Sequence, residues 1–366
     1  MEPLTRSPNF PCTPLAFAIA MLIAAPALAV DFNAPQVFTA ASAQPRVLAQ
    51  SSVDIPGNGP AISAQGTDFS LRDVLVRNAG SGGGLEAVGG AALDATSADV
   101  QTLGGNSPAI RVDGASLQLS DSSLVTRGIL SQGIQLGAQS GLQVQRSTIE
   151  TFETGSAGIF EQGNGLPGSV TDTQIHTHKA ESAGVWLDAS GPLSLIDTGI
   201  FTEGDASEGI SANAASQALL SAGSSVHTLG TNAAALSARN GSAIGMADGS
   251  LFTEGARSAA ATVSGGSDIR LERTQVLSAG AQSPALQIQG DSRISVLEGA
   301  VANVDGSTAR FMAGQGVGQL ALTDTRLTGP QALVEAVSGS QGQATVQGSR
   351  LSSSAGRLSP FGRTAR

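Results

Sequence analysis

The chain has 366 residues, a net charge of −10 and a pI near 4.7. Charged residues make up only 13% of it and aromatic residues 3%, while glycine occurs 47 times, which is unlike a helical enzyme and too aliphatic for a disordered tail. The acidic balance argues against a nucleic-acid partner and against anionic membranes, and the length suits two ordinary domains or one elongated repeat domain.

Residues 1–29 predict a signal peptide. The apolar run 15–29, LAFAIAMLIAAPALA, ends at Ala29 in the A-x-A pattern of a cleavage site. The run is too short for a comfortable membrane span, and no later stretch reaches spanning length. The only cysteine, Cys12, would leave with the signal. We therefore expect a cysteine-free mature chain from about Val30, located in the periplasm, on the cell surface or in the medium.

After the signal, the sequence divides into three parts. Residues 30–56 are expected to form an N-terminal cap, 57–356 a repeat region, and 357–366 a short arginine-rich tail. A parallel edge needs cover at both ends of a repeat array. The tail covers the last repeats only partly, so we expect residues 309–356 to fray.

The repeat is about 25 residues long, which lies within the usual range for stacked structural repeats. Residues 107–131 read SPAIRVDGASLQLSDSSLVTRGILS, and residues 284–308 read PALQIQGDSRISVLEGAVANVDGST. About twelve such units follow one another up to Gly356, and their first apolar positions recur at a nearly constant interval. These positions are Ile62, Leu85, Ile110, Ile134, Ile159, Val185, Ile210, Leu236, Ala261, Leu286, Phe311 and Val334.

Within each unit, apolar and polar residues alternate, which predicts three short strands separated by glycine-rich corners. One unit is too small to bury a core alone, so successive units must stack in parallel. The sequence therefore predicts an all-β fold, a right-handed parallel β-helix of about twelve rungs. At about 4.8 Å per rung it would be roughly 55–60 Å long. Glycine at the corners would supply the positive φ that tight bends require.

A polar column recurs two residues after an aliphatic position in each unit. We interpret it as an internal hydroxyl ladder in which each side chain bonds the next rung; the alternative is a functional row of hydroxyls. The column consists of Thr102, Thr126, Thr151, Thr177, Thr202, Thr228, Thr253, Ser278 and Asn303.

The unit G-[ILV]-x-[ILV]-x-x-x-S-x-L-x-[LV]-x-x-[ST]-x-[ILV]-x-T-x-G resembles the passenger domain of pertactin-type bacterial autotransporters, over roughly residues 57–356. The resemblance implies a β-helical surface or secreted protein, often an adhesin or virulence factor. It covers the passenger only, because the chain has no tyrosine and no segment like a translocator barrel. Surface display would then require a separate translocator. The RGD motif frequent in that family is also absent.

Alternation places two columns of side chains on the outside. One holds Phe160 and Trp186 on adjacent rungs. This pair could stack on a sugar or anchor a protein partner; the alternatives are a pair that only stabilises the sheet and a pair covered by a loop. The second column is unusually apolar and is either a partner surface or a face covered by the terminal segments. It runs through Glu150, His176, Phe201, His227, Phe252 and Leu277.

The sequence offers little catalytic chemistry. His176 and His178 share one side of a strand, but without a third ligand they predict no metal site, and no cofactor is expected. Glu203 and Glu254 share an outward column two rungs apart. We therefore expect a non-catalytic, adhesin-like protein whose partner is a host-surface protein or a glycan. The alternatives are a carbohydrate-active β-helix enzyme, a lyase or hydrolase, and a truncated autotransporter remnant.

Overall fold

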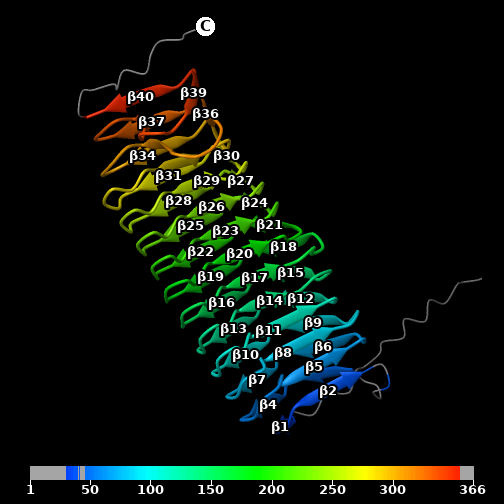
Figure 1. Ribbon diagram of the computed structural model, residues 1–366. Helices are drawn as coiled ribbons and strands as arrows, with labels where there is room; N and C mark the ends of the chain where they lie inside the picture. The colour runs from blue at the N-terminus through cyan, green and yellow to red at the C-terminus, as the bar shows by residue number, and fades with distance from the viewer. Residues whose placement is uncertain (1–29, 40, 42–45, 355–366) are drawn as a thin grey trace, which may run out of the picture.

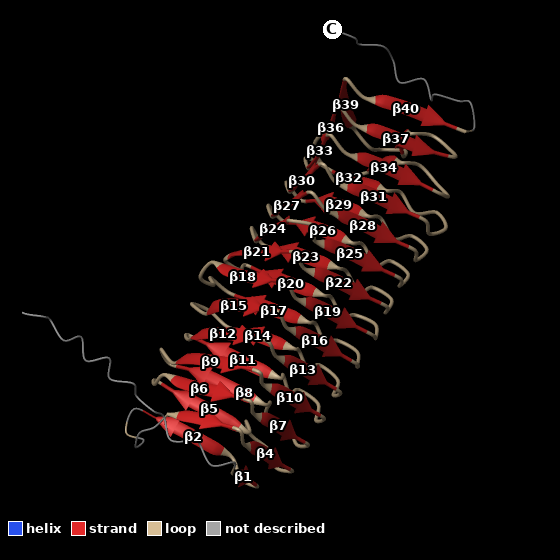
Figure 2. Cartoon of the chain, turned by 180° about the vertical axis from the view of Figure 1, so that it is seen from behind, coloured by secondary structure: helices blue, strands red, loops and turns tan. Residues whose placement is uncertain are grey.

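The computed structural model describes residues 30–39, 41 and 46–354. Within these residues the chain forms forty strands and no helix, so no helix there is long and apolar enough to cross a membrane. The strands build three parallel sheets that wind along one axis from β1 to β40 (Figure 1). Seen from behind, the same elongated stack of rungs appears (Figure 2). The prediction of an all-β parallel solenoid is confirmed, with about thirteen rungs.

Sheet A contains fourteen strands, sheet B thirteen and sheet C thirteen. The strands of sheet A are β1 (Asp31–Phe32), β4 (Ser52–Ile55), β7 (Leu75–Asn78), β10 (Asp99–Thr102), β13 (Ser123–Thr126), β16 (Thr148–Thr151), β19 (Gln174–Thr177), β22 (Gly199–Thr202), β25 (Ser225–Thr228), β28 (Ser250–Thr253), β31 (Gln275–Ser278), β34 (Ala300–Asn303), β37 (Arg326–Gly329) and β40 (Arg350–Ser353). Those of sheet B are β2 (Gln36–Thr39), β5 (Ile62–Gln65), β8 (Leu85–Val88), β11 (Ile110–Asp113), β14 (Ile134–Leu136), β17 (Ile159–Gln162), β20 (Val185–Asp188), β23 (Ile210–Asn213), β26 (Leu236–Arg239), β29 (Ala261–Ser264), β32 (Leu286–Gln289), β35 (Ala309–Met312) and β38 (Val334–Ala336). Those of sheet C are β3 (Val47–Ala49), β6 (Phe69–Arg72), β9 (Ala92–Thr96), β12 (Ser116–Ser120), β15 (Gly141–Gln145), β18 (Gly168–Thr171), β21 (Pro192–Ile196), β24 (Gln217–Ser221), β27 (Ala243–Ala247), β30 (Asp268–Glu272), β33 (Arg293–Leu297), β36 (Gly318–Thr323) and β39 (Gly342–Gln347).

Strands β1 to β4 fall inside the segment 30–56, for which we expected a cap. They pair in parallel with the next rung and extend all three sheets, β1 on β4, β2 on β5 and β3 on β6. Phe38 of β2 stacks on Phe69 of β6 with ring centroids 4.1 Å apart. The predicted signal peptide and tail lie outside the described residues.

Equivalent positions of successive rungs lie opposite one another. Ile110 pairs with Ile134, which in turn pairs with Ile159. Phe311 is the exception among the twelve predicted positions, because it lies opposite Ile288 while Ala309 lies opposite Leu286. The corner before β35 has five residues, 304–308, whereas the preceding one has seven, 279–285. The two-residue difference preserves alternation, so Phe311 still points inward and is 1% exposed.

The core is one continuous column of inward side chains. In the rung built from β11, β12 and β13, five aliphatic side chains are at most 1% exposed. They are Ile110, Val112, Leu117, Leu119 and Leu124. Each removes apolar surface from water, worth about 1.5–3 kcal/mol for a complete side chain, and the rungs above and below complete the enclosure.

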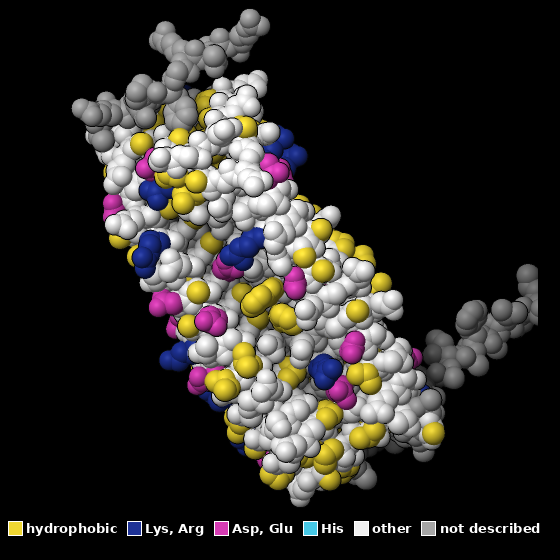
Figure 3. All heavy atoms as spheres, in the orientation of Figure 1, with side chains coloured by type: hydrophobic (Ala, Val, Ile, Leu, Met, Phe, Trp, Pro, Cys, Tyr) yellow, Lys and Arg dark blue, Asp and Glu magenta, His cyan; other side chains and the backbone are white. Residues whose placement is uncertain are grey.

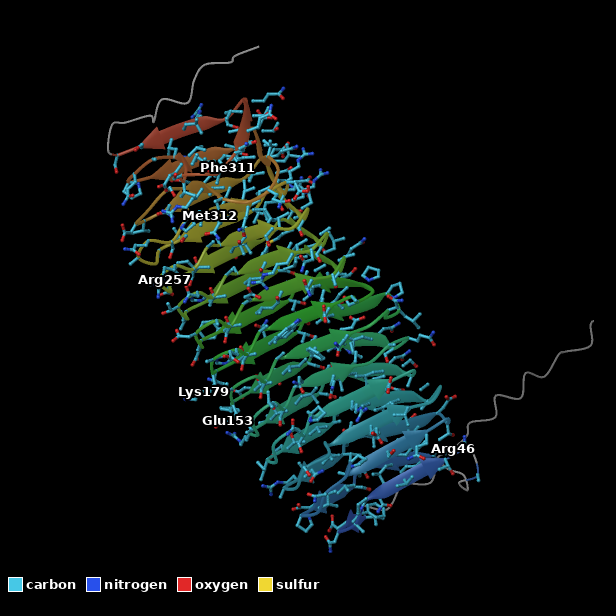
Figure 4. The ribbon with its side chains drawn as sticks, viewed as in Figure 1. Arg46, Glu153, Lys179, Arg257, Phe311 and Met312 are labelled. Carbon is cyan, nitrogen blue, oxygen red and sulfur yellow. The ribbon has the colours of Figure 1, made fainter. Side chains whose placement is uncertain are left out.

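Corner glycines such as Gly114 and Gly223 have positive φ, as expected, but they are not the main source of that geometry. Most residues with positive φ are not glycine, for example Asp121, Arg146 and Asp172, which repeat the same corner on successive rungs. Many glycines serve close approach instead. A Cβ on Gly230 would lie 1.8 Å from the Gly204 carbonyl oxygen of the previous rung. The corners of successive rungs stack along one edge of the molecule, where Glu153 and Lys179 lie near one another (Figure 4).

The polar column is buried, as expected, but its hydrogen bonds differ from the predicted ones. Each threonine hydroxyl donates to the carbonyl five residues later in its own rung, as Thr202 Oγ1 does to Ser207 O at 2.7 Å. The serine at that later position makes the contact between rungs, since Ser182 N donates to Ser207 Oγ at 3.0 Å. Because the corner places this carbonyl next to the threonine, the hydroxyl donates its hydrogen within its own rung and not to the next rung.

Candidate functional site

Two outer faces carry the residues expected to form a binding surface. On sheet B, Phe160 of β17 and Trp186 of β20 lie opposite each other on adjacent rungs. Their ring centroids are 5.8 Å apart at an interplanar angle of 75°, an edge-to-face contact. Trp186 is 41% exposed, while its neighbours Val185 and Leu187 are fully buried. Strand alternation therefore explains why the only tryptophan stands between two core residues.

The aromatic pair lines a groove of about 580 Å³. An ion pair between Arg239 and Glu208 lines it as well, and Arg239 Nη1 also donates to Ser211 Oγ at 3.2 Å. Glu181, Gln132, Leu130 and Asn232 complete much of the lining. The groove thus combines exposed aromatic rings with charged and hydrogen-bonding groups. The space-filling view shows one face of the molecule, where small groups of hydrophobic side chains lie among acidic and basic ones (Figure 3).

On sheet A, histidine and phenylalanine alternate along one outward column. Their neighbouring ring centroids are 4.8 Å apart for His176 and Phe201, 5.0 Å for Phe201 and His227, and 4.6 Å for His227 and Phe252. The parallel register places these side chains on consecutive rungs. The result is a continuous row of rings, so the four residues predicted for this face form one surface separate from the tryptophan groove.

The row ends in a cluster of two histidines and two glutamates. Glu150 lies opposite His176 in the ladder between β16 and β19. One corner residue further along, His178 follows β19 and Glu203 follows β22; Glu203 N donates to Thr177 O at 2.9 Å and continues the ladder. Two columns and three rungs thus place all four side chains together.

The glutamates lie on opposite sides of the imidazole pair. Glu150 Oε1 is 2.9 Å from His178 Nε2 and 3.8 Å from His176 Nδ1. Glu203 Oε1 is 2.9 Å from His176 Nε2, and its Oε2 is 3.3 Å from His178 Nδ1. The two ring centroids are 3.9 Å apart. Every ring nitrogen of the pair therefore faces a carboxylate.

The surroundings hold this arrangement. The His178 ring stacks on Phe152 with centroids 4.4 Å apart, and Arg127 Cζ lies 4.1 Å from the centroid of the same Phe152 ring. Partial burial acts to raise the pKa of the Glu203 carboxyl, but its hydrogen bonds with His176 and His178 and their charges bring the pKa below its usual value. Glu203 is thus kept as a carboxylate, an acceptor for both rings.

Glu161 is the other unusual acidic residue. It occupies a core position of β17, between Leu136 and Leu187 of the adjacent rungs, and is 3% exposed. Burial raises the pKa of its carboxyl to about 7, although the backbone N–H of Gly191 donates to Oε1 at 3.3 Å and acts in the opposite direction. The carboxyl is therefore neutral over a range in which glutamate is ordinarily ionised.

The structure combines into one cluster residues that the sequence had placed in separate groups, with Glu150 and His176 in one column and Glu203 in another. The histidines have carboxylate neighbours, in Glu150 and Glu203, where the sequence indicated no third ligand. The sequence spacing could have identified this cluster, since Glu150 lies one repeat before His176 and Glu203 lies one repeat after His178. Glu161 could have been recognised as a charged residue at an inward position.

No protein-family model and no curated protein matches the sequence. Among solved structures, the A-module of the mannuronan C-5 epimerase AlgE4 from Azotobacter vinelandii is similar in fold. The identity is 12% and the TM-score 0.44, over 83% of this chain and 90% of that one. Both are β-helices, and at this level the likeness carries no argument about activity.

Proposed function

We propose that this chain is an exported, non-catalytic β-solenoid that binds a partner through the groove on sheet B, as an adhesin-like interaction factor at the cell surface or in the medium. The resemblance of its repeat to pertactin-type passengers supports this role, and so does the signal-like segment 1–29. The observation that carries the proposal is the groove around Trp186, a residue that is 41% exposed in a chain with 3% aromatic residues.

The chemistry of the groove suits a host-surface glycan or protein. A flat indole face covers the apolar face of a sugar ring or an apolar side chain, and tryptophan and arginine are enriched among the residues that dominate binding energy. Ser211, Gln132 and Asn232 supply hydrogen bonds around the rings, and Glu208 with Arg239 supplies both charges. Such a mixture orients a polar ligand while the rings remove apolar surface from water.

A glycan array and a panel of host-surface proteins, probed with the mature chain, test this proposal. Trp186→Ala and Phe160→Ala should each weaken binding at least tenfold, whereas Phe252→Ala, the same kind of truncation on sheet A, should leave affinity unchanged. Trp186 fluorescence should respond to the ligand, since it is the only tryptophan. Binding that survives the loss of both groove aromatics would place the partner elsewhere.

A second candidate, a carbohydrate-active β-helix enzyme, is favoured by the acidic residues of the same groove. Glu181 and Glu208 lie with Arg239 beside the aromatic pair, the combination of carboxylates, cation and stacking rings that polysaccharide chemistry requires. Incubation with acidic and neutral polysaccharides, followed by product analysis, distinguishes the two functions. Turnover abolished by Glu208→Gln would favour the enzyme; binding without turnover favours the interaction factor.

We propose that a separate translocator delivers the chain to the surface. Fractionation of cells and medium should find the intact chain outside the cytoplasm. Material present only as periplasmic degradation products would instead favour a truncated remnant without a delivered function.

A further inference from the structure

One of the tautomer arrangements open to the cluster on sheet A leaves two ring-nitrogen lone pairs facing one carboxylate. In neutral imidazole, one ring nitrogen carries hydrogen and the other is an acceptor. If His176 Nε2 and His178 Nδ1 donate to Glu203, at 2.9 and 3.3 Å, then His176 Nδ1 and His178 Nε2 are the acceptors. Both of these atoms face Glu150 Oε1, which as part of a carboxylate only accepts.

Three acceptors that converge without a donor repel one another unless a cation lies among them. The ligand atoms of Glu150, His176 and His178 all lie within 4.8 Å of one another. Two ligand atoms on one tetrahedral zinc ion, with bonds of about 2.0–2.1 Å, are about 3.4 Å apart. The measured 2.9 and 3.8 Å from Glu150 Oε1 to the two nitrogens lie on either side of that value.

We propose that this cluster is a Zn²⁺ site, with Glu150, His176 Nδ1 and His178 Nε2 as ligands. Glu203 accepts the N–H of each ring on the side away from the metal, which fixes the tautomers and orients both imidazoles. Two imidazoles and one carboxylate are a ligand set that zinc favours. A water molecule completes the coordination from solvent.

The fold presents the ligands in a fixed geometry that remains accessible. Glu150 and His176 lie in a parallel ladder that is hydrogen-bonded to the rungs on both sides, and the His178 N–H donates to Thr151 O at 3.0 Å. Their side chains are 20–38% exposed, which gives an ion a path from solution. Stacking of His178 on Phe152 and packing of His176 against Phe201 restrict both rings.

The same chain contains half of this site, which serves as a control. His227 Nε2 contacts Glu254 Oε1 at 2.8 Å, as His176 contacts Glu203, and the two pairs have the same separation in sequence. Leu229 occupies the position equivalent to His178, so no second imidazole is present there. His227 should therefore contribute nothing to zinc affinity.

Calorimetric titration of the mature chain, purified without a histidine tag, with ZnCl₂ at pH 7.5 tests the site. We expect one ion per chain with micromolar or tighter affinity. His178→Ala and Glu150→Gln should weaken it at least 100-fold, Glu203→Gln by about 10–100-fold, and His227→Ala not at all. Circular dichroism of each variant verifies that the solenoid remains folded.

Proton NMR of the wild-type imidazoles gives a readout that needs no variant, because the chain contains only three histidines. Zinc should shift the ring signals of His176 and His178 and leave those of His227 in place. Absence of binding at 1 mM ZnCl₂, or affinity that depends on His227 and not on His178, would overturn the proposal. If the histidines and glutamates of the cluster only share protons with one another, no zinc binding at 1 mM ZnCl₂ is expected.

Discussion

Replacing Glu161 with glutamine should stabilise the protein in a way that depends on pH. The carboxyl lies among core leucines, and burial raises its pKa from 4.5 to about 7. Below pH 4.5 the group is protonated in both the folded and the unfolded chain, so its contribution to stability is fully present there. Between pH 4.5 and 7 only the unfolded chain releases the proton, so stability falls as pH rises.

The size of the effect follows from the same values. At about 1.4 kcal/mol per pH unit, the rise of the pKa from 4.5 to about 7 corresponds to about 3 kcal/mol lost by pH 8. Glutamine cannot ionise, and its Oε1 can still accept the N–H of Gly191. Relative to the wild type, Glu161→Gln should therefore gain about 3 kcal/mol between pH 4 and pH 8.

Urea denaturation at pH 4, 6 and 8, followed by Trp186 fluorescence, measures this difference. Trp186 lies on the rung next to Glu161, since Glu161 is opposite Leu187, so it reports locally even if the rungs do not unfold together. Glu298→Gln, at an exposed corner, is the matched control and should show no such dependence. A difference between Glu161→Gln and wild type that stays constant from pH 4 to 8 would refute the reasoning.

Three further expectations concern the ladder, the last rung and the N-terminus. Thr202→Val removes the hydroxyl that donates to the buried Ser207 carbonyl and should lower the free energy of unfolding, measured by urea denaturation, by about 1–3 kcal/mol. The control Thr154→Val, at an exposed corner, should leave it unchanged. Equal urea midpoints for the two variants would contradict the role of the ladder. Hydrogen exchange should be faster in β38 to β40, where side chains are largely exposed, than in the central rungs, and uniform protection through residues 309–356 would be evidence against fraying. Mass spectrometry of the exported protein should find a mature N-terminus at Val30, and retention of residues 1–29 would exclude the predicted cleavage.

The repeat made the fold accessible from sequence because alternation decides which side chains point inward. Trp186 between Val185 and Leu187 shows this clearly, since its outward position follows from the period of two alone. Corner geometry was less accessible. Nothing in the sequence distinguishes a threonine hydroxyl that bonds its own rung from one that bonds the next, and a two-residue change in corner length misplaced Phe311.

The candidate sites were missed where they depend on residues one repeat apart that differ in type. The sequence placed Glu150 beside His176 in one outward column, but ligands for His176 and His178 were considered only along the strand, and Glu203, on the next rung, was assigned to a different column. The groove required knowledge of corner side chains such as Glu208, whose reach toward Arg239 depends on the path of the loop. Comparing aligned columns of the repeat in pairs would have identified the histidine–glutamate cluster on sheet A but not the groove on sheet B.

The uniform register also makes this molecule modular in length. Thr228 and Thr253 are equivalent, so excision of residues 229–253 would join Thr228 directly to Glu254 and return every later side chain to its original face. Removing one residue fewer would invert inside and outside for the strand that follows. A gene encoding such a protein can thus be shortened or extended by one 25-residue rung at a time, which changes the length of the solenoid without changing the packing of its core.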